Sequence, residues 1–243
     1  MKNSLTALSL LYFVLPCSAQ DNQWAPAYQG TPLLNRDYIV DFNPQRGMAH
    51  WVAYELLPEE TLGEAERKSN FKRDDRVVGS PAHKDYTHSG YHRGHLKPAA
   101  DSKSSQSRMN DSFLMTNVAP QTPSLNRGSW KQLEETVRDW AREFGEVYVV
   151  CGPGLESQGQ LANGKVEVPT AYWKAILRTA PDTACIAFIM PNQGIKLATF
   201  PTYRVAVDSL EANIGIDLFP QLPDAVELRI EGDVDSPWSG LGD

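Results

Sequence analysis

The chain has 243 residues, enough for one domain of ordinary size or at most two small ones. Hydrophobic residues make up 41% and charged residues 22% of it, a balance typical of a globular protein with a substantial core. The net charge of −7 argues against a protein that coats nucleic acid through bulk charge. It does not exclude an enzyme with a local basic cleft.

The first nineteen residues differ in character from the rest. Lys2 supplies a positive charge, residues 8–15 are apolar, and residues 17–19 end in small side chains, as a signal-peptidase site requires. The apolar run is too short to cross a bilayer. We therefore predict a signal peptide cleaved near Ala19 and a periplasmic or secreted protein with no membrane partner. An uncleaved anchor and lipidation at Cys17 are the alternatives.

Removal of this segment leaves 22 basic and 30 acidic residues, so the mature chain is slightly more acidic than the full one. It also leaves two cysteines, Cys151 and Cys185, each in an apolar, strand-like run. An oxidising compartment permits a disulfide between them. Two buried free thiols are the favoured interpretation, and the disulfide stays open.

The first half of the chain contains several predicted strands. Residues 20–35 are rich in Gln, Asn, Pro and Gly and form a loose N-terminal segment in this prediction. Strands follow at 38–42 and 49–56, where aromatic and β-branched residues gather. Residues 58–90 are polar, charged and without a clear period, which predicts a long functional loop. A short strand is predicted at 113–116.

The clearest helix is predicted between residues 126 and 144, with Asn126 as its N-cap and Gly145 as its stop. Its apolar residues recur at steps of three and four: Trp130, Leu133, Val137, Trp140 and Phe144. Further strands are predicted at 147–151, 171–177 and 184–190, and a short helix at 202–212. Strands and helices mix without regular alternation, so the predicted fold class is α+β, with a mostly antiparallel central sheet and flanking helices. No linker divides residues 20–243, which predicts one domain.

Basic residues are concentrated in one segment of this acidic chain. Between residues 67 and 97 only three aspartates, Asp74, Asp75 and Asp85, oppose a larger group of cations: Arg67, Lys68, Lys72, Arg73, Arg76, Lys84, Arg93 and Lys97. Such a charge run is usually a solvated loop. Four of the five histidines fall in the same region, between residues 83 and 95, which favours a functional site instead.

The residue types in and after this segment suit the hydrolysis of a phosphodiester. A neutral histidine such as His95 can take a proton from water. An arginine such as Arg93 can stabilise the phosphoryl oxygens. Mg²⁺ stabilises a poor leaving group and needs only one or two protein oxygens. On a single helix Asn126 and Glu134 would lie within an arc of about 80° and face one cavity.

Each of these residues also has an ordinary structural interpretation. Asn126 alone is more often a helix cap, and Glu134 alone is usually a solvated helix residue. His95 alone is more often a hydrogen-bonded polar residue than a base, and Arg93 could simply pair with a carboxylate. Only the set as a whole points to a nuclease or phosphodiesterase site.

Three ordered motifs carry a resemblance to a known family. They are His92-Arg93-Gly94-His95, then Thr116-Asn117-Val118-Ala119-Pro120-Gln121, then Leu125-Asn126 followed by Trp130 and Leu133-Glu134. The chain resembles the DNA/RNA non-specific endonucleases, which have a ββα-metal finger and include secreted bacterial nucleases and endonuclease G. Shorter matches at residues 51–56, 152–153, 168–169 and 172–174 extend the resemblance over roughly residues 38–232.

The resemblance implies a role for each matched residue. His95 matches the general base, Asn126 the direct protein ligand of Mg²⁺, and Glu134 the carboxylate that holds water on the metal. Arg93 and Arg67 match arginines near the reacting phosphate, and Asn117 matches an asparagine that supports the site. The substrates implied are DNA and RNA, cleaved to 5′-phosphate products, and Mn²⁺ is expected to substitute for Mg²⁺. We expect the substrate phosphates to be bound by Arg67, Arg93, Lys97 and Arg127.

One position departs from the family pattern. The aspartate that usually precedes the arginine is His92 in this chain. Because base and metal ligand are retained, we expect activity, at an altered rate or pH optimum. A phosphodiesterase for small nucleotides and a catalytically weakened nucleic-acid-binding relative are the alternatives. No inhibitor protein or oligomeric state is predicted.

Overall fold

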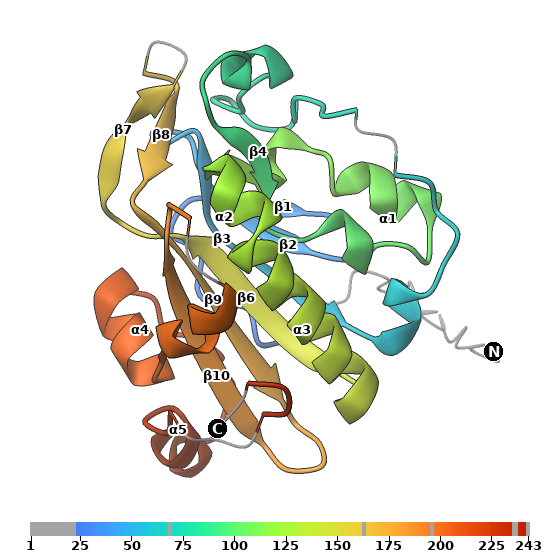
Figure 1. The fold of residues 1–243 in the computed structure, drawn as a ribbon, viewed down its shortest axis with the longest axis vertical. Helices are drawn as coiled ribbons and strands as arrows, with labels where there is room; N and C mark the ends of the chain where they lie inside the picture. Colours follow the sequence, from blue (N-terminus) through green and yellow to red (C-terminus); the bar gives the residue numbers. More distant parts are fainter. Residues whose placement is uncertain (1–22, 68–69, 162–163, 195–196, 235–237, 242–243) are drawn as a thin grey trace, which may run out of the picture.

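A seven-stranded sheet organises the computed structural model, which describes residues 23–67, 70–161, 164–194, 197–234 and 238–241 (Figure 1). The predicted signal peptide lies outside these ranges. Neighbouring strands pair antiparallel throughout, in the order β1-β2-β3-β6-β9-β10-β11. The strands are β1 (Thr31–Leu34), β2 (Ile39–Asn43), β3 (Met48–Leu56), β6 (Val147–Pro153), β9 (Ala171–Arg178), β10 (Ala184–Pro191) and β11 (Arg204–Val205).

Within the described ranges, two small two-stranded ribbons and five α-helices complete the fold. The ribbons are β4 (His92–His95) with β5 (Val118–Gln121), and β7 (Ser157–Leu161) with β8 (Val166–Pro169). The helices are α1 (Gln106–Asp111), α2 (Pro123–Arg127), α3 (Ser129–Phe144), α4 (Val207–Ile214) and α5 (Asp224–Ile230). No helix in the described ranges is both long enough and apolar enough to span a bilayer. The predicted class, α+β with a mostly antiparallel sheet, is confirmed.

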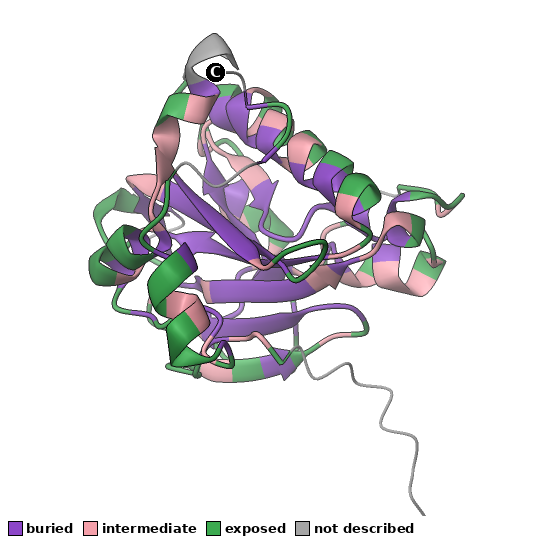
Figure 2. Cartoon of the chain, turned by 90° about the horizontal axis from the view of Figure 1, so that it is seen from below, coloured by how far each residue is buried: buried purple, intermediate pink, exposed green. Residues whose placement is uncertain are grey.

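Both faces of the sheet are covered, and each strand divides its side chains between them. In β6, Val149 and Cys151 belong to the core beneath α3, whereas Tyr148 and Val150 belong to the core beneath α4 and α5. This alternation follows from the two-residue period of a strand. Figure 2 shows α3 on one side of the buried sheet and α4 and α5 on the other. The sheet therefore separates two distinct cores.

The two cysteines lie on opposite faces of this sheet. Cys151 in β6 packs in the core beneath α3, and Cys185 in β10 packs in the core beneath α4. Both are buried free thiols, and each Sγ donates to a backbone carbonyl, Cys151 to Leu96 and Cys185 to Ile230. The disulfide that the sequence left open is therefore not formed.

The predicted helix start was wrong. Asn126 lies in the last turn of α2, a separate short helix that begins with Pro123 and is capped by the side chain of Thr122, which accepts from the Leu125 N–H. Gly128 interrupts the chain between α2 and α3, where a Cβ would lie 2.5 Å from the Ser124 carbonyl oxygen. Only at its end does α3 agree with the prediction, since Gly145 stops it at φ 88°.

Two other predicted elements also differ. Residues 113–116 form a turn and the start of a 3₁₀ turn rather than a strand, and the strand begins at Val118. Of the predicted helix at 202–212, only the part from Val207 onward is α-helical, and α4 continues to Ile214. The ribbon strands β4 and β5 had no strand prediction, because short polar segments lack a clear hydrophobic period.

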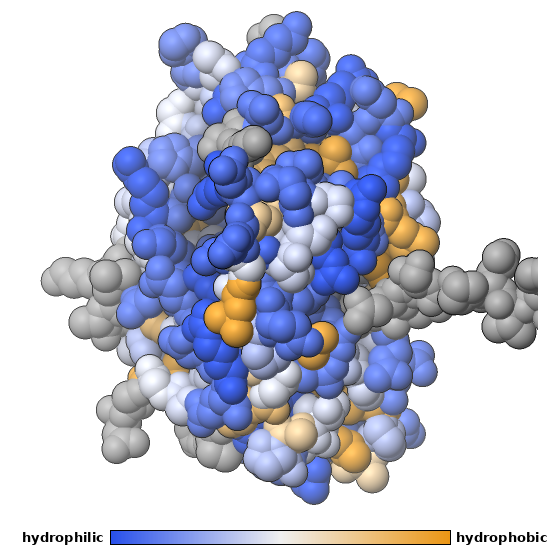
Figure 3. Space-filling model, turned by 90° about the vertical axis from the view of Figure 1, so that its right-hand side faces the viewer, coloured by the Kyte–Doolittle hydropathy of each residue, from blue (hydrophilic) through white to orange (hydrophobic). Residues whose placement is uncertain are grey.

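The surface shows no concentrated apolar area on the face drawn in Figure 3, where hydrophobic spots are small and separate among hydrophilic residues. The large hydrophobic side chains that are exposed come from unrelated parts of the chain: Tyr28, Leu34, Leu62, Val78, Leu155, Leu228 and Val234. Single exposed apolar residues of this kind are normal. The feature that distinguishes this protein is instead a polar cavity.

Candidate active site

The β4–β5 ribbon and α2 lie side by side and form a β-β-α unit (Figure 1). Residues of β4 and α2 line a polar cavity. In the ribbon Gly94 pairs with Ala119, and His95 pairs with Val118. A Cβ on Gly94 would lie 2.3 Å from the side chain of Gln121, so glycine leaves the space that this buried side chain occupies. Gly94 thus serves the packing of the ribbon.

The cavity has a volume of about 420 Å³ and gathers most of the predicted site residues. Its lining combines arginines, histidines, an amide and a carboxylate with a few apolar side chains. It is formed by Arg67, Phe71, Tyr91, His92, Arg93, His95, Pro98, Ala99, Ala100, Asn126, Arg127, Lys131, Glu134 and Arg138. Residues from 67 to 138 thus meet in one place.

His95 is buried in the wall of this cavity, with 8% of its surface exposed. Its ring packs edge-on against Phe113 and beside Phe71, with centroid distances of 4.9 and 5.2 Å. Burial, reinforced by the charge of Arg67, lowers the pKa of His95 to about 3. The ring is therefore neutral near pH 7, and its Nε2 atom has no hydrogen-bond partner among the described residues.

Asn126 and His92 contact each other directly across the β-β-α unit. Their Nδ2 and Nδ1 atoms are 3.0 Å apart, and the amide N–H donates to the neutral imidazole. Burial, then the charges of Arg127 and Arg93, lower the pKa of His92, which favours this neutral acceptor. Because His92 engages the NH₂ group of Asn126, the Oδ1 atom of Asn126 remains available as a ligand for a cation.

Arginines surround these groups. Arg93 in β4 is held by the His83 carbonyl, to which its Nη2 donates at 2.8 Å, and it lies over the rings of Phe71 and Tyr86. Arg67 lies over the Phe113 ring, 5.9 Å from its centroid. Arg127, at the end of α2, is exposed at the cavity rim. All three occupy positions suited to a phosphate.

Glu134 in α3 supplies the carboxylate of the cavity. Burial raises its pKa to about 7, with Asp101 acting in the same direction and Lys174, Arg138 and Arg67 opposing it. Arg138 itself is engaged, because its Nη1 donates to Asp101 at 2.9 Å. A buried carboxylate with a raised pKa gains most from a cation placed beside it. Together with the Oδ1 atom of Asn126, it fits a divalent metal that prefers oxygen ligands.

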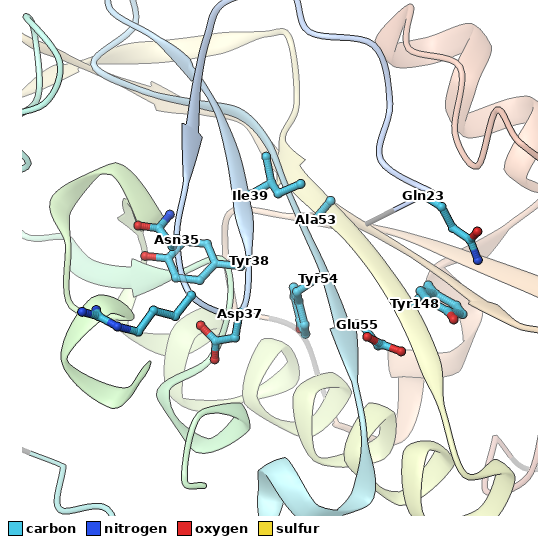
Figure 4. Close-up of a pocket in the computed structure, with 10 residues that line it drawn as sticks. Gln23, Asn35, Asp37, Tyr38, Ile39, Ala53, Tyr54, Glu55 and Tyr148 are labelled. Carbon is cyan, nitrogen blue, oxygen red and sulfur yellow. The ribbon is translucent and has the colours of Figure 1, made fainter. Parts of the chain in front are cut away.

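Two predicted site residues do not reach the cavity. Lys97 is completely buried, and its Nζ donates to Asp37 at 2.8 Å, to Ser102 at 2.7 Å and to the Asp101 carbonyl at 3.1 Å. Asp37 lines a second, smaller cavity of about 180 Å³ (Figure 4). The expectation that Lys97 contacts substrate phosphates is therefore wrong, because a lysine paired in the core has no N–H left for a ligand.

Asn117 is also fully buried and supports the site from behind. Its Oδ1 accepts from the Lys97 N–H, and its Nδ2 donates to the carbonyls of Lys97 and Ser112, each at 2.9 Å. The amide therefore fastens the chain that follows His95. The supporting role of Asn117 stays a prediction, for which these contacts supply a physical basis.

Other charges of the 67–97 segment are neutralised within the fold. Arg76 pairs with Asp74, Arg73 with Asp75, and Lys165 from outside the segment pairs with Asp85. The basic character of the cavity therefore comes from a few arginines that converge on it.

Sequence reasoning missed the residues that attach the β-β-α unit to the main sheet. Asn192, just after β10, donates to the carbonyls of Pro120 and Pro169 and accepts from the Thr122 N–H. Tyr172 in β9 donates to the Pro120 carbonyl at 2.7 Å. These contacts join segments up to 72 residues apart. The only sequence signal for them was the resemblance to the family at residues 172–174.

Fold and cavity together define the class of protein. A neutral histidine beside converging arginines, an amide oxygen and a carboxylate suits an enzyme that hydrolyses phosphodiesters. Comparison with known proteins agrees. The model of the DNA/RNA non-specific endonuclease family matches residues 24–225. The chain belongs to this family and is a hydrolytic nuclease.

Individual relatives support this assignment. A nuclease of Nostoc sp. is 34% identical over 221 residues, which cover 84% of this chain and 78% of the relative. Mitochondrial endonuclease G of Homo sapiens is 32% identical over 202 residues, covering 76% and 68%. Among solved structures, an endonuclease G in complex with the inhibitor EndoGI matches with a TM-score of 0.77 and 26% identity, covering 83% of this chain and 90% of that one.

The burial of His95 predicts how stability depends on pH. The unfolded chain, with a histidine pKa of about 6.5, binds a proton between pH 6.5 and 3 that the folded protein excludes. The contribution of the neutral His95 ring to the free energy of unfolding is therefore complete above pH 6.5. As pH falls below 6.5, this contribution decreases by about 1.4 kcal/mol per pH unit. The variant His95→Gln has no titrating ring and should not show this decrease. Urea unfolding at pH 7.5 and 5 should show the parent losing about 2 kcal/mol more than the variant; equal losses would contradict a neutral, buried His95.

Proposed function

We propose that this nuclease is Mg²⁺-dependent, cleaves DNA and RNA without sequence specificity, and uses His95 as its general base. The observation that carries the proposal is the neutral His95 ring in the wall of the arginine-lined cavity. A neutral ring nitrogen at that place can accept the proton of the attacking water.

The other residues divide the remaining work between binding and charge compensation. Arg67, Arg93 and Arg127 bind the phosphate oxygens and hold the diester against the cavity wall. Phe71 and Phe113 exclude water from one side of His95 and keep it unprotonated. Arginine contacts to phosphates are independent of base identity, which supports cleavage without sequence specificity.

A divalent metal completes the proposed site. Asn126 would hold it through Oδ1, which the contact with His92 leaves free to ligate, and Glu134 would compensate its charge. When bound, Mg²⁺ supplies the positive charge that stabilises the departing alkoxide, and Mn²⁺ can do the same. Departure of the 3′-oxygen leaves the phosphate on the 5′ side of the downstream nucleotide.

Substitutions at the two histidines of β4 test the base. His95→Ala should reduce plasmid cleavage by roughly 10²–10⁴-fold or more, because the proton acceptor is gone. His92→Ala should cost less, and His92→Asp should retain activity, since a carboxylate can also accept from the Asn126 amide. Initial rates of plasmid nicking, with circular dichroism to confirm folding, make the comparison. An inactive His92→Ala beside an active His95→Ala would reject the assignment.

Metal dependence is tested at Asn126. Chelation should abolish cleavage, Mg²⁺ or Mn²⁺ should restore it, and Asn126→Ala should lower the rate by at least about 10²-fold. Asn110→Ala, which removes an exposed amide on α1, is the matched control and should change little. Full activity in excess chelator would contradict the metal. Parallel assays on a small chromogenic diester, and end-labelling of the products, test substrate size and the 5′-phosphate.

Export remains a proposal from the sequence. We propose that the protein is periplasmic or secreted and that it begins near Gln20 after cleavage, because residues 1–19 have the charge, apolar run and small residues of a signal peptide. N-terminal sequencing of material from the periplasm or medium is expected to give Gln20 or a close neighbour. Recovery of the intact N-terminus in the cytoplasm would reject it.

A further inference from the structure

An acidic cluster lies on the face of the sheet opposite α3 and the nuclease cavity, where α4 and α5 pack (Figures 1 and 2). The N–H of Asp208, in the first turn of α4, donates to the Glu231 carbonyl at the end of α5. Asp208 and Glu211 are three residues apart and therefore share one face of α4. Three carboxylates from two helices consequently meet at one point.

The geometry of these carboxylates matches a single bound cation. One oxygen each from Asp208, Glu211 and Glu231 lies within 4.8 Å of the other two. Two oxygens that bind the same Ca²⁺ at about 2.4 Å can be no more than about 4.8 Å apart. Glu211 is held in place, because its Oε1 accepts from the Leu218 N–H at 2.6 Å.

Glu231 supplies an independent sign of an occupant. Glu231 is only 4% exposed, and its buried Oε1 atom has no hydrogen-bond partner within the ranges that the structure describes. A buried carboxylate without a partner is costly, and a cation removes that cost. Asp208 is exposed, so an ion can enter from solvent on that side.

The charged side chains that act on Glu231 and Glu211 are themselves acidic, so they add negative charge instead of compensating it. Burial, then Glu211, Glu227, Asp208 and Asp217, raise the pKa of Glu231 to about 8. Burial and neighbouring carboxylates likewise raise the pKa of Glu211 to about 7, although the Leu218 N–H opposes this. Like charges therefore repel one another here, and a divalent ion would relieve the repulsion.

We propose that Asp208, Glu211 and Glu231 form a calcium-binding site that ties the start of α4 to the end of α5. Three convergent carboxylates suit Ca²⁺, which takes six to eight oxygens in flexible geometry, better than Mg²⁺, which keeps most of its waters and uses one or two carboxylates. Water supplies the remaining ligands on the exposed side. The ion is structural, since it lies across the sheet from the nuclease cavity.

The test measures the melting temperature in chelator and in about 10 mM CaCl₂, with NaCl of equal ionic strength as the salt control. Asn126→Ala is the background, so that calcium in the nuclease site does not contribute. At about 100 times the dissociation constant, calcium should raise the melting temperature by about 5–10 °C. Glu231→Gln and Asp208→Asn should each remove most of this rise. Glu227→Gln removes a nearby charge that is outside the cluster and should retain it.

Each other outcome overturns the proposal. No rise beyond the NaCl control means that no calcium binds here. A rise in the parent that disappears in Asn126→Ala places the ion in the nuclease site. An unchanged rise in Glu231→Gln, with a higher melting temperature in chelator, identifies a pair of carboxyl groups sharing a proton instead. Should Glu231→Gln fail to fold, Asp208→Asn decides the matter, because its side chain is exposed and outside the core.

Discussion

The side-chain amide of Asn117 makes three buried hydrogen bonds, and the geometry around His95 depends on them. This one side chain accepts from the Lys97 N–H and donates to the carbonyls of Lys97 and Ser112. The chain that leaves β4 is thereby fastened to the segment that carries Phe113, whose ring packs on His95. Loss of the amide would leave these buried polar groups without hydrogen-bond partners, which costs about 1–3 kcal/mol of folding stability for each group. The position of His95 thus depends on a residue that does not line the cavity itself.

An acidic protein that acts on a polyanion has to separate its charges in space. The chain carries a net charge of −7, yet Arg67, Arg93 and Arg127 converge on one cavity. Other cations of the basic segment at residues 67–97 are paired with carboxylates, as in Arg76 with Asp74 and Lys97 with Asp37. Positive charge is therefore concentrated at the cavity rather than spread over the whole surface. On the far face, carboxylates gather instead.

The sequence by itself determined the fold class, the main strands and several of the residues that line the cavity. Strands at 38–42, 49–56, 147–151, 171–177 and 184–190 were predictable because buried strands need β-branched and aromatic residues in short runs. The end of α3 was predictable because Gly145 adopts a positive φ. The three motifs located His95, Asn126 and Glu134, which the fold brings to one cavity. Each of these features depends on residues close together in the chain.

The tertiary structure alone decided what depends on contacts between distant segments. Lys97 belongs to a basic run, yet Asp37, sixty residues away, draws it into the core. The functions of Asn117 and Asn192 follow from backbone groups that only the folded chain presents to them. Asn126 lies in the last turn of α2 rather than at the cap of α3, because the chain breaks at Gly128, where a Cβ would clash with the Ser124 carbonyl. His95 is neutral because Phe71 and Phe113 remove water from it, and desolvation is a property of packing that no local pattern encodes.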